Sequence, residues 1–338
     1  MPTWSGILNE LISATRENGL PPFDVVRRKY LVRLSEHTGR PVILYATRFT
    51  QDGVPLPPDL VSITEEDGQG LMEVVHGLSG GAVDIILHSP GGSPMAAEAM
   101  VCYLRSKFND IRVVVPHLAM SAATMIACAA DVIVLGKHSF LGPTDPQIIL
   151  QTALGARMVP AHAILIQFEQ AIKECSDPTR IGAYLPMLPQ YGPDLLATCS
   201  NVIQMSEGLV ASWLRKYMFR GDAAADRKAT EISKWLSDHP THGVHSRHLS
   251  RDELEAKGLK IQHLEQDQTA QDLFLSVFHA TTHTFSGTTA VKIIENNLGR
   301  AFIKQVQMSV PAQGHEIPRA AQAPIEQSRT SRAPVVER

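Results

Sequence analysis

The chain has 338 residues, of which 44% are hydrophobic and 19% charged, so it can bury the core of one large domain or two ordinary ones. This composition excludes a wholly disordered protein. The formal net charge of -3 gives no electrostatic basis for nucleic acid or an anionic membrane as the main partner.

The amino terminus, the most apolar run and the cysteines predict the cellular compartment of the protein. The amino terminus lacks a cationic start followed by a long apolar segment, so we expect no secretory signal. The most apolar run, 118–135, contains Asp131 and is predicted to form a buried helix and strand instead of a transmembrane segment. The cysteines are too widely spaced for a metal site and predict free, buried thiols without disulfides in a reducing compartment, the cytoplasm: Cys102, Cys128, Cys175 and Cys199.

The first part of the chain predicts helices around one strand. Residues 1–40 have apolar positions at helical spacing, then a basic segment, and predict two helices. Residues 41–47 are rich in β-branched and apolar residues and predict a strand, which a Gly- and Pro-containing loop follows at 51–58. A helix is expected at about 65–78, with Thr64 as its N-cap.

The next part alternates strands with helices. We expect strands at 83–88, 111–115 and 132–135, and helices at 94–107 and from about 119 to 130. This alternation predicts right-handed crossovers and a parallel sheet that is buried on both faces.

Beyond residue 146 the pattern becomes mainly helical. Helices are predicted at about 160–174, 193–218, 223–237 and 267–281. From residue 309 onward Pro, Gln, Ser, Arg and Ala dominate, which predicts a disordered tail.

Two turns in the alternating region could carry chemistry. The first, Ser89-Pro90-Gly91-Gly92, follows a buried strand and precedes a helix, so its backbone N–H groups can approach a negative charge. The second contains Ser121 at the start of a helix, where an alkoxide and an oxyanion would both be stabilised. Both turns should lie at the same edge of the parallel sheet. An ordinary tight turn and an ordinary N-cap are the alternative interpretations.

Four motifs together resemble the serine dehydrogenase proteinase family of the Clp/signal-peptide-peptidase-A fold, which is related to the crotonases. They are HSPGG (88–92), PHLAMSAAT (116–124), AADVIVL (129–135) and LGPTDPQ (141–147). The resemblance is close over about 41–175. It implies an α/β fold of Clp/crotonase-like ββα repeats with a parallel sheet core and helical extensions at both ends.

The resulting division of the chain has four parts. They are an N-terminal helical extension (1–40), the Clp/crotonase-like serine peptidase domain (41–262), a C-terminal helical segment (263–308) and a disordered tail (309–338).

The resemblance implies that Ser121 attacks a peptide carbonyl, with the backbone N–H groups of Gly91 or Gly92 and of Ala122 as the oxyanion hole. Relatives commonly have glycines where this chain has Ala122-Ala123. Alanine is compatible with the start of a helix, although its methyl group could narrow the oxyanion pocket.

The general base has several candidates. Clp-type peptidases have a histidine about two dozen residues after the serine, where this chain has Asp145, so that triad does not carry over. Signal-peptide-peptidase-A enzymes use a lysine further downstream, which here would be Lys173, a residue that could equally be a solvated helix residue. Thr241-His242 resembles a pair found late in the family, which makes His242 the alternative base. His138, His162 and His245 are further histidines that could titrate near neutral pH.

Asp145 could orient the base, although a structural role in its Pro-flanked turn is the simpler interpretation. The histidines of the 239–248 run are spaced by three, but Pro240 and Gly243 interrupt a continuous helix, so we expect no metal site and no cofactor.

The sequence thus predicts a cytoplasmic serine endopeptidase that acts on unfolded or extended polypeptide. The fold commonly forms rings, so a homo-oligomer is expected. The alternative is a catalytically inactive peptide-binding or assembly module, or a crotonase-like acyl-thioester binder. A crotonase would normally offer an acidic residue near the second turn, which Ser121-Ala122-Ala123 does not provide.

Overall fold

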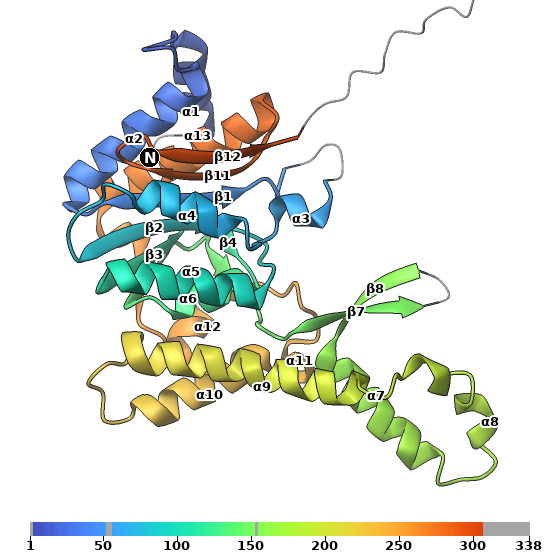
Figure 1. The fold of residues 1–338 in the computed structure, drawn as a ribbon. Coiled ribbons are helices and arrows are strands. Elements are labelled where there is room, and N and C mark those ends of the chain that lie inside the picture. Colours follow the sequence, from blue (N-terminus) through green and yellow to red (C-terminus); the bar gives the residue numbers. More distant parts are fainter. Residues whose placement is uncertain (1–2, 52–55, 153–154, 307–338) are drawn as a thin grey trace, which may run out of the picture. The chain divides into compact units, whose positions relative to one another are not determined.

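A seven-stranded mixed sheet forms the centre of the protein in the computed structural model, which describes residues 3–51, 56–152 and 155–306 (Figure 1). The strands in spatial order are β10 (Ile261–His263), β5 (Val132–Leu135), β3 (Asp110–Val115), β2 (Ala82–His88), β1 (Val42–Thr47), β11 (Ala290–Asn296) and β12 (Ala301–Gln305). The first five strands run parallel, whereas β11 is antiparallel to β1 and β12 is antiparallel to β11.

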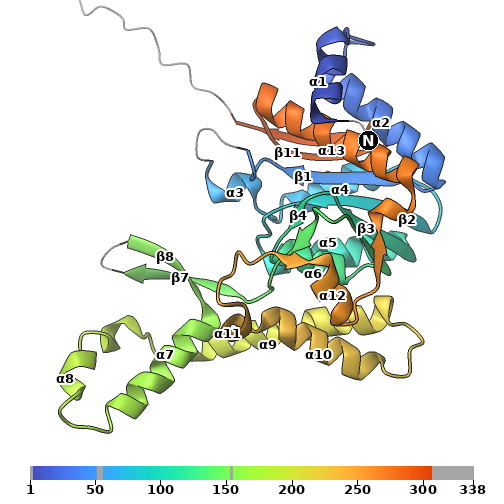
Figure 2. The same ribbon diagram turned by 180° about the vertical axis from the view of Figure 1, so that it is seen from behind.

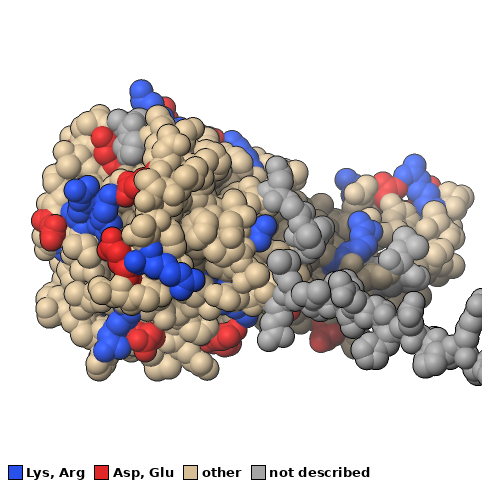
Figure 3. All heavy atoms as spheres, turned by 90° about the horizontal axis from the view of Figure 1, so that it is seen from above, with Lys and Arg blue, Asp and Glu red and all other residues tan. Residues whose placement is uncertain are grey.

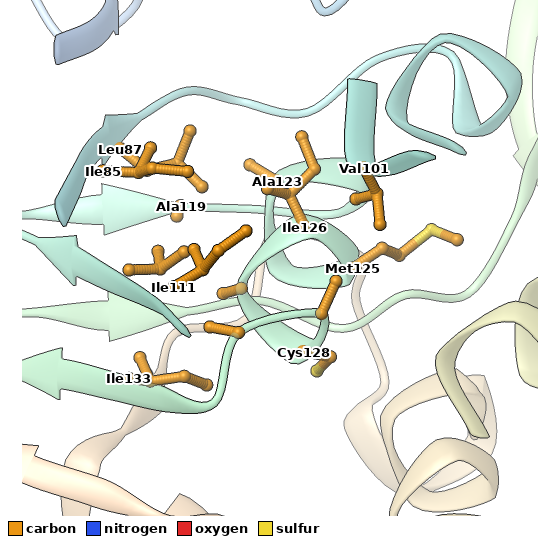
Figure 4. Close-up of a cluster of buried hydrophobic side chains, with 14 of the residues drawn as sticks. Ile85, Leu87, Val101, Ile111, Ala119, Ala123, Met125, Ile126, Cys128 and Ile133 are labelled. Atoms are coloured by element: carbon orange, nitrogen blue, oxygen red, sulfur yellow. The ribbon is translucent and has the colours of Figure 1, made fainter. Parts of the chain in front are cut away.

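Helices cover both faces of this sheet. Successive strand residues point to opposite sides, and both sets are apolar here, so each face needs a layer of helices to bury it. On one face, Ile43 and Ile85 belong to a core with α4 (Asp67–Val75), α5 (Pro94–Lys107) and α6 (Ala122–Cys128) (Figure 1). Figure 4 shows Ala123 and Ile126 of α6 among side chains of the strands and of α5.

On the other face, Leu44 and Ile86 pack with α2 (Pro22–Thr38) and α13 (Gln268–Gly287), which Figure 2 shows in front of the strands. Helix α1 (Trp4–Ser13) packs on α2 and α13 through Ile7 and Leu11.

The remaining elements lie outside the central sheet and its two helical layers (Figure 1). A small sheet contains β4 (Leu118–Ala119), β6 (Phe140–Leu141) and β9 (Leu249–Ser250). A hairpin consists of β7 (Gln147–Thr152) and β8 (Gly155–Pro160). The other α-helices are α3 (Pro58–Val61), α7 (Ala161–Glu174), α8 (Ile181–Tyr184), α9 (Leu195–Trp213), which a π-helix continues over Leu214–Met218, α10 (Ala225–Ser237), α11 (His239–His242) and α12 (Arg251–Ala256). Helices α9 and α10 lie below α6 in Figure 1.

The strands and helices predicted between residues 41 and 135 are present, and the helix 94–107 has the predicted ends. The helix expected from about 119 to 130 is shorter, because residues 118–119 form the unpredicted strand β4 and α6 begins at Ala122. Helix α5 has proline at its first position and Ser93 as its N-cap, whose Oγ accepts a hydrogen bond from Ala96 N at 3.1 Å. Its start could be predicted because these signals lie in neighbouring residues. Thr64 does not cap α4, because its buried Oγ1 has no hydrogen-bond partner among the described residues.

Two further regions differ from the prediction. The central sheet is mixed, because the segment 263–308, expected to be helical, contains strands β11 and β12 after helix α13. The hairpin of β7 and β8 was also not anticipated. The pair of β1 and β11 joins segments far apart in the chain and leaves little local signal, because strand formation depends on the neighbouring strand. The predicted disordered tail, 309–338, lies outside the described residues.

Candidate functional site

The two turns that the sequence singled out are joined by backbone hydrogen bonds. Ser89 N donates to Leu118 O at 3.1 Å, and Met120 N donates to Ser89 O at 2.9 Å. Ser89 and Ala119 thereby form a parallel bridge that extends β2 beside β4. The glycine turn after β2 and the serine turn after β4 therefore lie side by side, as predicted from the position of the strands.

Gly91 fits directly against the serine turn. A Cβ at this position would lie 2.6 Å from Met120 O, 2.7 Å from Ser121 Cβ and 2.9 Å from Ala122 N. Its φ of 98° is also unfavourable for residues with a side chain. Glycine is required here for both reasons, and the result is close contact between the two turns.

Gly92 is fixed from its other side by the segment that precedes α4. Ile63 N donates to Gly91 O at 2.7 Å and Ser93 N donates to Ile63 O at 2.9 Å, so Gly92 and Ile63 form a parallel bridge. A Cβ on Gly92 would lie 2.4 Å from both Ile63 N and Ile63 O. This pairing directs the N–H of Gly92 away from Ile63, because successive amides along an extended segment point to opposite edges.

The two glycine amides differ in their hydrogen bonds. Gly91 N donates to Ser89 Oγ at 3.2 Å, whereas Gly92 N has no hydrogen-bond acceptor within the described part of the chain. The N–H of Ala122, at the first turn of α6, is likewise without an acceptor there. Gly92 and Ala122 therefore each present a free donor.

Ser121 has a strained backbone. Its φ of 52° and ψ of -121° are unfavourable for a residue with a Cβ, and Asn18 is the one other described non-glycine residue with positive φ. Such strain costs about 1–3 kcal/mol and is concentrated at functional sites. The side chain is half-buried and does not cap α6, so the ordinary N-cap interpretation does not describe this serine.

The alanines that follow Ser121 are core residues. Ala122 is 1% exposed and Ala123 is fully buried, and both pack in the core between the sheet and α5. Their methyl groups therefore fill space on the core side of α6 (Figure 4 labels Ala123).

His88, at the end of β2, supports the serine turn from the α13 face. Its Nδ1 donates to Leu118 O at 3.1 Å, and its ring packs against Phe49 and Phe278. Complete burial lowers the pKa of His88 to about 3, so the ring is neutral at neutral pH. A neutral imidazole can remain in this apolar position and hold β4 in register with β2.

The two bases inferred from the resemblance have no described contact with Ser121. Lys173 is exposed in the last turn of α7. His242 is 6% exposed and both of its ring nitrogens are occupied: Nε2 donates to Trp235 O at 2.6 Å and Nδ1 accepts from Arg247 at 3.2 Å. Burial also lowers the pKa of His242. In this arrangement His242 has no free lone pair for a serine hydroxyl.

Asp145 joins two histidines that the sequence did not connect with it. The carboxylate is fully buried and accepts from His239 Nδ1 at 2.9 Å and from His245 Nδ1 at 2.7 Å. Each ring keeps Nε2 without a hydrogen-bond partner among the described residues. An imidazole held through Nδ1 by a carboxylate is the arrangement of a general base in hydrolases.

The small sheet brings Asp145 and His245 to the end that carries Ser121. Leu141 pairs with Ala119 on one side and with Leu249 on the other. Asp145 and His245 lie four residues beyond this row, and a Cβ on Gly142 would lie 2.5 Å from Met120 Cε. Asp145 and His245 are equally far along the chain from the pair Leu141–Leu249. This relation can be recognised only once the pairing of β6 with β9 is known.

The histidines of the 239–248 run separate to different partners. His239 and His245 bind Asp145, His242 binds Trp235, and the ring of His248 stacks on Phe140 at 5.2 Å. Within the described ranges, no group of three or more His, Cys, Asp or Glu side chains has an arrangement that could hold a metal ion. Of the other candidates, His138 lies beside His117 and His279, and His162 has a buried Nδ1 without a described partner.

The surface charges and the helices of the described residues give two observations on possible partners of the protein. On the face drawn in Figure 3, Lys and Arg side chains are interspersed with Asp and Glu side chains. No helix in the described part of the chain combines the length and apolar character required to cross a membrane.

Comparisons with known proteins extend the resemblance. Residues 23–187, which contain both turns, match the profile of a family described as ClpP-like SDH-type serine proteinase. The uncharacterized protein MJ0137 of Methanocaldococcus jannaschii is 29% identical over 236 residues, which cover 68% of this chain and 73% of that protein. The uncharacterized protein MJ1495 of the same organism is 31% identical over 164 residues, and the match covers 47% of each chain.

Proposed function

We propose that this chain, whose residues 23–187 belong to the ClpP-like SDH-type serine proteinase family, is a serine endopeptidase that hydrolyses unfolded or extended polypeptide. The observation that carries the proposal is the strained, half-buried Ser121 packed against Gly91, with two free backbone donors beside it. The family also implies the Clp/crotonase fold, and the parallel part of the central sheet agrees with it.

The proposed reaction follows from the positions of these groups. Ser121 Oγ attacks the carbonyl carbon of the peptide bond as its proton passes to a base, and the carbonyl oxygen becomes an oxyanion. The N–H groups of Gly92 and Ala122 donate to this oxyanion. Collapse of the intermediate releases the amine, which takes the proton from the base, and leaves an acyl-enzyme on Ser121. Water then hydrolyses the ester by the reverse proton movements.

The free edge of the Gly91–Ser93 segment supports an extended substrate. Ile63 occupies one edge of this segment, so a peptide could add as a strand along the other edge. Main-chain hydrogen bonds would then supply affinity and allow varied side chains, which suits a peptidase that acts on unfolded chains.

The base is proposed to be His245, oriented by Asp145. Within one chain this pair lies at the Ser121 end of the small sheet, and Nε2 of the ring is available to accept a proton. Lys173 could serve only if a second copy supplied it, because it is exposed on α7 without a described contact to Ser121. His245→Ala should therefore abolish activity, whereas Lys173→Ala should retain it. The reverse result would assign the base to a lysine from a neighbouring subunit.

A homo-oligomer in the cytoplasm completes the proposal. Large apolar side chains are exposed on the hairpin and on α7, which supports contact with further copies: Ile149 (65%), Met158 (65%), Ile166 (47%) and Ile172 (59%). The wide spacing of the four cysteines supports a reducing compartment. Light scattering at micromolar concentration tests the oligomer, and a strict monomer would contradict it.

The decisive experiment is labelling with a serine-reactive fluorophosphonate. The wild-type protein and Ser106→Ala, a control at an exposed serine of α5, should be labelled, whereas Ser121→Ala should not. Equal labelling of all three proteins would refute the peptidase proposal and favour an inactive peptide-binding module or an acyl-thioester binder.

A further inference from the structure

Lys292 is a buried charge that the proposed reaction does not use. It lies on β11, is fully buried, and its Nζ donates to Asp67 Oδ1 at 2.6 Å and to Oδ2 at 2.9 Å. Nζ also donates to the backbone oxygen of Ser62 at 2.8 Å. The ammonium group therefore bonds both a carboxylate and the chain segment before α4.

Asp67 continues this set of contacts. The carboxylate is 1% exposed and its Oδ2 also accepts from Tyr45 OH and from Thr64 N, each at 2.8 Å. Ser62 and Thr64 are the two neighbours of Ile63. The Lys292–Asp67 pair thus holds the backbone on both sides of Ile63 from elements that lie far apart in the sequence.

Ile63 is the residue that fixes the glycine turn. Its N–H and its carbonyl oxygen bond Gly91 O and Ser93 N, and the fit against Gly92 leaves no space for a Cβ. A displacement of the 62–64 segment would therefore move the Gly91–Ser93 segment, and with it the free N–H of Gly92. The contacts form a continuous path from Lys292 to the oxyanion donor.

We propose that Lys292 and Asp67 are positioning residues of the active site, which hold the 62–64 segment so that Gly92 N–H is directed at the oxyanion formed from Ser121. This inference rests on the proposed function. It assigns the pair a role in transition-state stabilisation, although neither side chain touches the reacting atoms.

A purely structural role makes a different prediction. Burial opposes the charge of Lys292 and lowers its pKa, whereas Asp67 acts in the opposite direction. Replacing a buried ion pair by apolar residues of similar volume is often neutral or stabilising. The double variant Asp67→Leu/Lys292→Met removes both charges and both attachments to the 62–64 segment, so it can separate folding from positioning.

The neighbouring strand offers a matched control. Lys304 of β12 also reaches the start of α4, but it pairs with Glu66, whose side chain is 46% exposed, and it does not bond the 62–64 segment. Lys304→Met therefore removes a lysine–carboxylate pair of the same type and leaves the path to Gly92 intact. An exposed pair of this kind contributes about 0–1 kcal/mol.

The experiment measures fluorophosphonate kinetics and backbone protection in the full chain. The maximal labelling rate, kinact, should fall at least about tenfold in Lys292→Met and in the double variant, with KI little changed, because removing an oxyanion donor typically costs about 10²–10³ in rate. Hydrogen exchange at Ile63 and Ser93 should be faster in both variants, whereas β2 remains protected. Lys304→Met should match the wild type in both measurements.

The outcomes separate this inference from the proposed function. Wild-type kinact and wild-type exchange at Ile63 and Ser93 in the folded double variant would overturn the positioning role. An increase in KI without a fall in kinact would also overturn it. If the wild type itself is not labelled, the peptidase proposal fails, and hydrogen exchange alone then decides whether the pair holds the glycine turn.

Discussion

Gly91→Ala tests whether close contact between the two turns is required for activity. The added Cβ would lie 2.6 Å from Met120 O, whereas ordinary contact begins at 3.4 Å, so the two turns must separate by about 0.8 Å, the difference between these distances. All three nearest atoms on the serine turn, Met120 O, Ser121 Cβ and Ala122 N, are backbone atoms or Cβ, which cannot rotate away. The whole displacement must therefore pass into the position of Gly91 or of Ser121 and Ala122.

The expected effect has two parts. A side chain at a φ of 98° costs about 1–2 kcal/mol, and overpacking adds about 1–3 kcal/mol, so the free energy of unfolding should fall by about 2–5 kcal/mol. A misplacement of 1 Å at a reacting centre can cost about 10²-fold in rate. We therefore expect kinact for fluorophosphonate to fall by about 10- to 100-fold in the folded fraction.

Gly80→Ala is the matched control. Gly80 has a φ of 96°, close to that of Gly91, but an added Cβ would meet no atom within 4 Å. This variant should lose only the backbone contribution of about 1–2 kcal/mol in urea denaturation and keep the wild-type kinact. Equal free energies of unfolding and equal labelling rates for Gly91→Ala and Gly80→Ala would refute a requirement for close contact between the two turns.

Three further variants probe strain, buried charge and pH dependence. Ser121→Gly should unfold about 1 kcal/mol less readily than Ser121→Ala, because glycine adopts a φ of 52° without strain; equal urea midpoints would argue against strain at this residue. Asp145→Asn should lose about 1.5–3 kcal/mol in the same assay, because it weakens hydrogen bonds to His239 and His245, whereas Asp226→Asn, with an 84% exposed side chain, should be neutral. His88 has a folded-state pKa of about 3 and an unfolded value near 6.5, so its contribution to stability is retained above pH 6.5 and lost as the pH falls toward 3. At pH 5 the loss is about 2 kcal/mol, and His88→Asn should show a smaller difference between pH 7 and pH 5; an unchanged difference would exclude His88 as its source.

The sequence predicted most strands and helices of the 41–135 region, but not β4, because the signals of the predicted elements are local. Ser93 and Pro94 define the start of α5, and the glycines of the first turn permit backbone angles that other residues avoid. The family resemblance, drawn from motifs between residues 88 and 147, is confirmed over residues 23–187. The pairing of the two turns also followed from the rule that parallel strands end at one edge of a sheet.

The partners of the site required the tertiary structure. Lys292 and Asp67 are separated by more than two hundred residues, and nothing near either residue indicates a buried pair. The Asp145–His245 contact depends on the register between β6 and β9, and the antiparallel strands β11 and β12 depend on β1 as a template. Local backbone preferences are encoded in neighbouring residues, whereas strand register and buried charge pairs are set by packing between distant segments. The sequence alone therefore determined the two turns of the candidate site, and only the folded chain determined what holds them in place.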